Sequence, residues 1–128
     1  MTEGKRRKIW GIEQDVLDMI NEAAKDTYPD EFLATLRAEK GIVTEILLLP
    51  GTLSGEHSGT FHLHMLPIDL SVVGTVHSHP SFSNMPSEAD ISLFGRFGNT
   101  HIITCIPFDK RSWKAYDYNG DEIELEVV

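Results

Sequence analysis

Two histidines and an aspartate lie at fixed intervals in the stretch TVHSHPSFSNMPSEADISLF, residues 75–94. His77 and His79 are two residues apart at the end of an apolar run, so in a strand their side chains project from the same face. A catalytic zinc usually takes three protein ligands and keeps one position open, and two histidines with one carboxylate are a recurring set. Asp90 is the natural third ligand if the loop 80–86 lays the following helix beside the strand end. The spacing therefore indicates half of a metal site, with Asp90 as the candidate for its third ligand.

The same stretch also fits a capped helix without any metal. Ser87 and Asp90 have the spacing of a capping box, in which each side chain bonds to the backbone of the other residue. Two histidines at this spacing are a weak signal by themselves, because His62 and His64 have it as well. That second pair is followed by MLPIDL and not by a carboxylate at a helix start. We therefore expect His62 and His64 to be strand residues, and we do not expect Asp69 to be a ligand.

Hydrolysis at a metal also needs a base that takes a proton from water and returns it to the leaving amine. The best candidate is Glu31, which follows the turn Tyr28-Pro29-Asp30 at the start of a predicted strand. Spacing alone does not distinguish Glu31 from Asp30 or Glu45 among the 20 acidic residues.

Apolar periodicity predicts one α/β domain, with a mixed, mostly antiparallel sheet and two main helices. The first helix has Ile12, Val16 and Ile20 on one stripe and is stopped by Pro29. The expected elements after it are a hairpin over 31–50 that turns at 40–41, a loop over 51–60, apolar β-forming runs over 61–70 and 71–79, a short helix over 87–98, a buried strand over 101–108 and a hairpin over 113–128 that turns at Asn119-Gly120.

Composition narrows the class of protein further. A chain of 128 residues is about one domain and can bury a core without disulfides, and its single cysteine, Cys105, fits a core strand. No run of 18 apolar residues and no signal peptide is visible, which predicts a soluble, cytoplasmic protein with no membrane partner. A zinc deaminase is disfavoured because its H-x-E and P-C-x-x-C elements are absent from the sequence.

The charge of the chain is unevenly distributed. The net charge is −9, although residues 5–8 supply four of the 11 basic residues. An acidic body repels nucleic acid, so no nucleic-acid partner is expected. Residues 1–8 are predicted to be a flexible basic tail and residues 9–128 to be the folded domain.

A family resemblance turns these separate signals into one site. The segment 77–90 has H-S-H-P at 77–80, seven residues between His79 and Ser87, and S-x-x-D at 87–90. This pattern resembles the JAMM signature of metal-dependent MPN domains, H-x-H-x7-S-x2-D. All four signature positions agree in residue type and spacing, and the likeness extends over nearly the whole chain. The sequence is similar above all to the small stand-alone archaeal members. The resemblance implies a single-domain MPN (JAMM) fold.

The resemblance also implies a role for each matching residue. His77, His79 and Asp90 would bind Zn²⁺, and Ser87 would hold the attacking water and stabilise the tetrahedral oxyanion. In this family an upstream glutamate on an early strand is the general base, and the segment PDEFLATL puts Glu31 where that residue is expected. The capping role of Ser87 and Asp90 is compatible with these functions.

By the same resemblance the chain would be a zinc metalloprotease of the isopeptidase type. JAMM enzymes cleave the bond between the C-terminal glycine of a ubiquitin-like modifier and a lysine, and stand-alone archaeal members, called desampylases, act on small archaeal modifiers. The expected partners are therefore modifier proteins and their conjugates. A glycine-glycine tail is thin enough to lie extended on a sheet edge, and the loop 51–60 is the candidate clamp.

Several alternatives stay open at this point. A metallopeptidase or amidase that acts on a sulfur-carrier tail or a small amide would use the same site. A non-catalytic MPN scaffold is disfavoured because all the metal ligands are present, and a pure interaction module would hold no metal. A homodimer is compatible with the sequence, which does not decide the oligomeric state.

Overall fold

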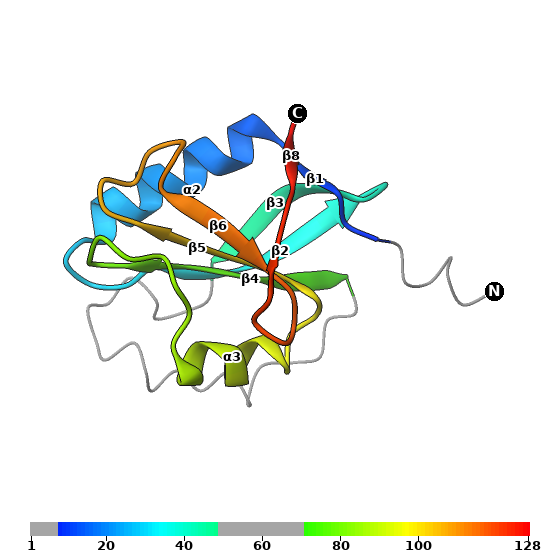
Figure 1. Cartoon of the computed structure of the whole chain (residues 1–128). Coiled ribbons are helices and arrows are strands. Elements are labelled where there is room, and N and C mark those ends of the chain that lie inside the picture. Colours follow the sequence, from blue (N-terminus) through cyan, green and yellow to red (C-terminus); the bar gives the residue numbers. More distant parts are fainter. Residues whose placement is uncertain (1–7, 49–70) are drawn as a thin grey trace.

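The structure, a computed structural model, describes residues 8–48 and 71–128. Its strands form one sheet, and its two helices lie on opposite faces of that sheet (Figure 1). The elements in chain order are β1 (Gly11–Ile12), α2 (Gln14–Thr27), β2 (Leu33–Glu39), β3 (Ile42–Leu48), β4 (Val72–His79), α3 (Glu88–Phe94), β5 (Thr100–Cys105), β6 (Trp113–Tyr116), β7 (Glu122–Ile123) and β8 (Glu126–Val127). The predicted α/β class, with a mixed and mostly antiparallel sheet, is confirmed.

The strand order makes the sheet curl. The eight strands are arranged β7-β6-β5-β4-β2-β3-β1-β8, so β7 and β8 are the two ends of the order. Only residues 124 and 125 connect these two strands along the chain. Since the three residue steps from Ile123 to Glu126 span at most about 11 Å, the sheet must curve until its ends approach each other.

The two faces of the sheet pack against different helices. Along a strand successive side chains point to opposite faces. Val76 and Ile102 accordingly belong to the core cluster that includes the buried face of α2, whereas Ile103 belongs to a second cluster with Phe94 of α3. His77 follows Val76 and therefore projects to the α3 side, with its ring centroid 6.5 Å from that of Phe94. Strand alternation thus decides which face carries the histidines.

Both predicted hairpins are present. Strands β2 and β3 pair antiparallel around Lys40 and Gly41, which have φ values of 54° and 84°. Strands β6 and β7 pair around Gly120, whose φ is 87°. The side chain of Asp117 supports that turn by accepting from the amides of Asn119 and Asp121 at 2.9 and 3.0 Å.

Two details of the predicted elements were wrong. Ile12 lies in β1 and not in the first helix, because its backbone joins the sheet between Val43 and Val127. It still packs in the same core as Val16, so its position in the sequence fits the helical spacing although it lies in a strand. The last strand is also not part of the terminal hairpin, since only Glu122–Ile123 pairs with β6 and Glu126–Val127 pairs with β1.

Some predictions fall on residues outside the described ranges. They concern the basic segment 1–7, the clamp loop 51–60, and His62, His64 and Asp69. The division between tail and domain near residue 8 also stays a prediction. The buried position of Cys105 in β5 is confirmed, since only 4% of the residue is exposed. Neither helix in the described ranges is long and apolar enough to cross a membrane.

A buried histidine joins β5 to β4 on the α3 side of the sheet. The Nδ1 atom of His101 accepts from the Thr75 amide at 3.2 Å, and its Nε2 lies 3.0 Å from the Gly98 carbonyl oxygen. The ring stacks on Phe94 with a centroid distance of 4.3 Å. An accepting Nδ1 beside a carbonyl-facing Nε2 requires the neutral ring with its proton on Nε2. Burial lowers the pKa of His101 to about 4.

The stability of the fold is therefore expected to fall in mild acid. An unfolded histidine titrates near 6.5, so between about pH 6.5 and pH 4 the unfolded chain binds the proton that folded His101 refuses. The free energy of unfolding should be constant above this window and drop by roughly 3 kcal/mol across it because of His101. Urea unfolding of the wild type and of His101→Gln at pH 7 and pH 5 measures the part of this loss, about 2 kcal/mol, that falls between these two pH values. Equal acid losses in both proteins would show that His101 is not responsible.

Candidate metal centre

Strand β4 brings the two histidines to one end of the sheet. It lies between β2 and β5, and His77 pairs with Leu33 on one side and Ile103 on the other. His77 is only 4% exposed, while His79, the last residue of the strand, is half-buried. The sheet therefore fixes the backbone of both histidines and leaves their imidazoles facing α3.

The start of α3 brings the carboxylate. Ser87 is the N-cap of this helix, and its Oγ accepts from the Asp90 amide at 3.1 Å. In return Oδ2 of Asp90 accepts from the Ser87 amide at 2.9 Å. The predicted capping box is thus confirmed, and it holds the carboxylate of Asp90 in one orientation at the helix start.

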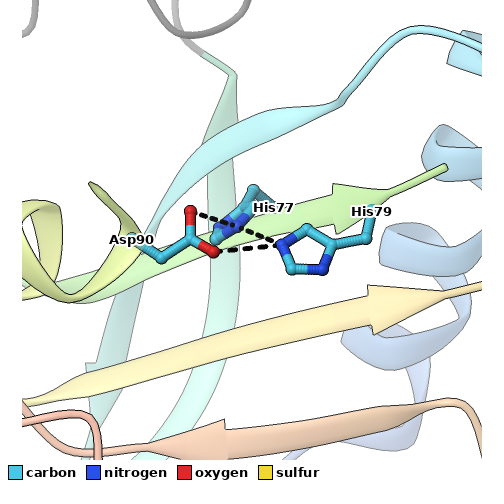
Figure 2. Close-up of side chains that lie close together, drawn as sticks. All are labelled: His77, His79 and Asp90. Carbon is cyan, nitrogen blue, oxygen red and sulfur yellow. Dashed lines mark hydrogen bonds and ion pairs between the residues drawn. The ribbon is translucent and has the colours of Figure 1, made fainter. Parts of the chain in front are cut away.

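The three side chains converge on one point. Figure 2 shows Asp90 reaching from α3 toward both imidazoles. Its Oδ1 lies 3.2 Å from Nε2 of His77, and its Oδ2 lies 3.1 Å from Nε2 of His79. The two Nε2 atoms are 3.2 Å apart. The structure therefore brings together the His77, His79 and Asp90 set that the spacing predicted, as a group able to hold a metal ion.

The charges in this group favour the ionised carboxylate. Burial alone would raise the pKa of Asp90, but the hydrogen bonds from His77 and His79 outweigh it and hold that pKa well below its usual range. The pKa of His79 is raised, first by its hydrogen bond to Asp90, against burial that would lower it, and then by the Ser83 carbonyl. Asp90 is therefore a carboxylate at neutral pH.

A backbone carbonyl orients the second histidine. Nδ1 of His79 lies 2.9 Å from the carbonyl oxygen of Ser83, so it carries the proton and donates it. With that proton fixed on Nδ1, Nε2 is the nitrogen left to bind a metal, in place of the proton that it otherwise donates to Asp90. Histidines that bind metals usually donate their other ring N–H to a carbonyl or carboxylate oxygen in this way. The Nδ1 atom of His77 is buried, and no described residue is its hydrogen-bond partner.

Hydrogen bonds to Ile106, Ser112 and Tyr116 hold the loop that carries the Ser83 carbonyl. The Ile106 amide donates to the Ser81 carbonyl oxygen at 2.8 Å. The hydroxyl of Tyr116 donates to the Asn84 carbonyl oxygen at 2.8 Å, and the Asn84 side chain donates to the Ser112 carbonyl oxygen at 3.1 Å. These bonds hold the loop between β4 and α3 on both sides of residue 83.

Glu31 comes to the same end of the sheet. Leu33 lies opposite His77, and the pairing continues outward because the Ser78 amide donates to the Phe32 carbonyl oxygen at 3.0 Å. Glu31 is one residue further out, and its charge is among the causes that raise the pKa of His79. Glu31 is half-buried and precedes β2, whereas the sequence predicted it as the first residue of the strand.

The other acids considered for the base lie elsewhere. Glu45 pairs across the β2–β3 hairpin with Arg37 at 3.3 Å, four positions along β2 from Leu33 and away from the metal-binding end. Asp30 is exposed in the turn, where its amide donates to the Thr27 carbonyl oxygen at 2.8 Å. The fold thus separates three carboxylates that spacing did not distinguish.

The donor set and its geometry fit zinc. Zinc bonds to imidazole nitrogen and carboxylate oxygen are about 2.0–2.2 Å long, so neighbouring ligands of a tetrahedral ion lie roughly 3.3–3.5 Å apart. The three ligand-to-ligand distances of 3.1 to 3.2 Å are close to this spacing. Three protein ligands also leave one tetrahedral position open, as catalytic zinc requires.

Sequence reasoning missed the residues that support the ligands. Nothing in the sequence marks the Ser83 carbonyl, because every residue has one. Asn84 and Tyr116 meet only through long-range folding and share no local pattern. Ser78 is different, since it is a hydroxyl residue between two histidines of a strand and must therefore face the opposite side of the sheet.

Comparisons with known proteins agree with this geometry. The family of prokaryotic homologs of the JAB domain matches residues 13–116. A probable metalloprotease of Haloferax volcanii is 36% identical over 134 residues, which cover 97% of this chain and 83% of that protein. The description of this relative as a metalloprotease agrees with the metal-binding group formed by His77, His79 and Asp90.

Solved structures give the same result. A structure described as JAMM, a metalloprotease-like zinc site in the proteasome and signalosome, is 45% identical and has a TM-score of 0.76, covering 94% of this chain and 99% of its own. A JAB1/MPN domain protein from Archaeoglobus fulgidus is 48% identical with a TM-score of 0.75, covering 92% and 98%. A protein from Desulfitobacterium hafniense, 18% identical with a TM-score of 0.64, covers 94% of this chain and 93% of its own and shares the fold. With its ligand geometry and its relatives in agreement, this chain belongs to the JAMM family of JAB/MPN domain proteins and is a metalloprotease with a zinc site.

Proposed function

We propose that this protein is an isopeptidase that hydrolyses the bond between the C-terminal glycine of a ubiquitin-like modifier and an amine, chiefly a lysine. The observation that carries the proposal is the convergence of His77, His79 and Asp90 beside Glu31, in a chain of the JAMM family. His77, His79 and Asp90 would hold the ion. When bound, zinc supplies a Lewis acid that polarises the scissile carbonyl and lowers the pKa of water.

Glu31 acts as the general base in this proposal. Its carboxylate takes a proton from the attacking water and passes it to the departing amine, so that one group serves both halves of the reaction. Its place beside His79 and its partial burial support this role, because the base must reach the water next to the ligands while remaining open to substrate.

Ser87 stabilises the charge that develops on the carbonyl oxygen. Its Oγ already accepts from the Asp90 amide, which leaves the hydroxyl proton free to point outward to an oxyanion. A donor aimed at the developing charge favours the transition state over the bound substrate. The cap and the catalytic role therefore use different parts of the same hydroxyl.

An extended tail is the substrate shape that the sheet supports. β1 covers only Ile42 and Val43 of β3, so among the described strands none pairs with the outer edge of β3 beyond Val43. Leu48 pairs with Ala34, near Leu33 and His77, so this edge runs toward the metal-binding end. A glycine-glycine tail could add to such an edge by backbone hydrogen bonds and enter the site without large side chains.

The direct test uses a defined conjugate. A ubiquitin-like modifier ending in Gly-Gly is joined through its C-terminal carboxyl to the lysine side chain of a reporter peptide and incubated with the zinc-loaded protein. We expect cleavage after the last glycine, loss of cleavage with a chelator and recovery with zinc. Matched substrates are the same modifier as a linear fusion and a small Gly-Gly amide. Cleavage of only the small amide or only a carrier-protein tail would favour the alternative amidase or sulfur-carrier activity.

Replacing Ser87 with glycine separates its two roles. Glycine is a tolerated N-cap that costs only a few tenths of a kcal/mol, so α3 and its carboxylate should remain in place. Loss of the hydroxyl is expected to lower kcat about 10²–10³-fold, as for other oxyanion donors. Steady-state kinetics, zinc content and thermal unfolding of Ser87→Gly check this. A variant with normal zinc content and normal kcat would remove Ser87 from the chemistry.

A further inference from the structure

The residue between the two histidines is buried and makes an unusual bond. Ser78 is 1% exposed, and alternation along β4 turns its side chain to the face opposite the imidazoles. Its Oγ accepts from the amide of Phe32 at 2.9 Å. Ser78 is therefore absent from the metal centre, yet it contacts the segment that carries Glu31.

This bond replaces a missing ladder bond. In an antiparallel pair that exchanges hydrogen bonds, each residue both donates to and accepts from the backbone of the other. The Ser78 amide donates to the Phe32 carbonyl oxygen at 3.0 Å, but the Phe32 amide is bonded to the Ser78 side chain. Regular pairing thus ends here, and β2 begins one residue later, at Leu33.

The replacement matters because Phe32 is fully buried and directly follows Glu31. A buried amide needs an acceptor, and without the Ser78 hydroxyl the backbone at residue 32 would have to move to find one. Any such movement is passed on to Glu31, whose carboxylate must lie within hydrogen-bond reach of the attacking water. A misplacement of about 1 Å can lower a rate 10²-fold.

We propose that Ser78 is a positioning residue that sets the place of Glu31 through the Phe32 amide. The proposal rests on the proposed function of Glu31 as the general base. In this arrangement one face of β4 carries the two metal ligands, His77 and His79. The opposite face carries Ser78, which holds the backbone next to the base. One strand end therefore fixes the distance between the ligands and the base.

The test compares Ser78→Ala with a control on the neighbouring strand. Thr104 pairs with Ser78 in the β4–β5 register, is buried, and donates its hydroxyl to Asn21 at 2.7 Å, away from Glu31. Thr104→Val removes a buried hydroxyl without touching the base. We expect Ser78→Ala to lower kcat about 10- to 100-fold with unchanged KM and zinc affinity, and Thr104→Val to leave kcat unchanged. Ser78→Thr, which keeps an oxygen at this position, should restore much of the rate.

A second measurement does not depend on activity. Hydrogen exchange of the Phe32 amide should become faster in Ser78→Ala and stay slow in Thr104→Val. If Ser78→Ala does not fold, Ser78→Cys keeps the buried volume but offers only a weak acceptor, and the same two measurements apply. In a Glu31→Gln background, Ser78→Ala should cause no further loss of rate, because both changes act through one group.

Three results would overturn the proposal. One is normal kcat in Ser78→Ala despite fast exchange of the Phe32 amide. Another is a loss of zinc affinity that matches the loss of rate, which would mean that Ser78 acts through the histidines. A third is a full additional loss in the Glu31→Gln background. Failure of the proposed function looks different, because the wild type would then not cleave the modifier–lysine bond, while the exchange result would stand.

Discussion

Glu31→Gln is expected to lower kcat for isopeptide cleavage about 10²–10⁴-fold, the range that a positioned general base supplies, while the protein still binds zinc. Glutamine keeps the size of the side chain but cannot take a proton from water. Glu31 is not one of the three converging ligands, so zinc content should stay near one ion per chain. Single-turnover kinetics together with metal analysis of the purified variant measure both quantities.

Two neighbouring acids provide matched controls for this variant. Asp30→Asn removes a negative charge one residue away, in the exposed turn. Glu45→Gln removes the carboxylate that pairs with Arg37 on the hairpin. Both should keep kcat within about two-fold, because Asp30 is exposed in the turn and Glu45 is paired with Arg37. Full activity of Glu31→Gln, or an equal loss in Asp30→Asn, would mean that the base has been assigned to the wrong residue.

Asp90→Asn is expected to weaken zinc binding by more than roughly 100-fold, since even a lost partner of a ligand costs 10- to 100-fold. The change is nearly isosteric. An amide oxygen at this position can still accept from the Ser87 amide, so the start of α3 should persist. What disappears is the anionic donor that lies 3.1 to 3.2 Å from both Nε2 atoms. Activity should be lost together with the metal.

The readout for Asp90→Asn is zinc affinity by competition with a chelator, supported by thermal unfolding. A ligand at 100 times its Kd stabilises the folded state by about 2.7 kcal/mol, so zinc should raise the Tm of the wild type by several degrees and that of the variant hardly at all. Glu88→Gln is the control, because it removes one charge from the exposed first residue of α3. If Asp90→Asn retained zinc as tightly as Glu88→Gln, Asp90 would not be a ligand.

The sequence predicted that His77, His79 and Asp90 lie together, because much of their arrangement is local. His77 and His79 share a face through strand alternation alone, and the capping box at 87–90 fixes the start of a helix within four residues. Both hairpin turns were likewise visible in the sequence, because Gly41 and Gly120 occupy positions with positive φ. Local rules of this kind act over a few residues and do not need the rest of the fold.

The errors arose where pairing partners are far apart in the chain. Ile12 has the spacing of the helical stripe, but Val43 and Val127 draw its backbone into the sheet. The last strand leaves its hairpin for the same reason, since its partner is β1 at the other end of the chain. A strand edge accepts any extended segment that reaches it, and the sequence does not state which one will.

By itself, then, the sequence determined the candidate ligand set, the cap and the mixed, mostly antiparallel class of the sheet, because each depends on short-range periodicity and on a signature of residue types. Spacing did not distinguish Glu31 from Asp30 and Glu45, and the family resemblance favoured Glu31. The tertiary structure adds the physical difference, since the charge of Glu31 acts on His79 whereas Glu45 pairs with Arg37. It also decided that the Ser83 carbonyl orients His79 and that Ser78 holds the Phe32 amide. Such contacts depend on strands far apart in the chain meeting in one register.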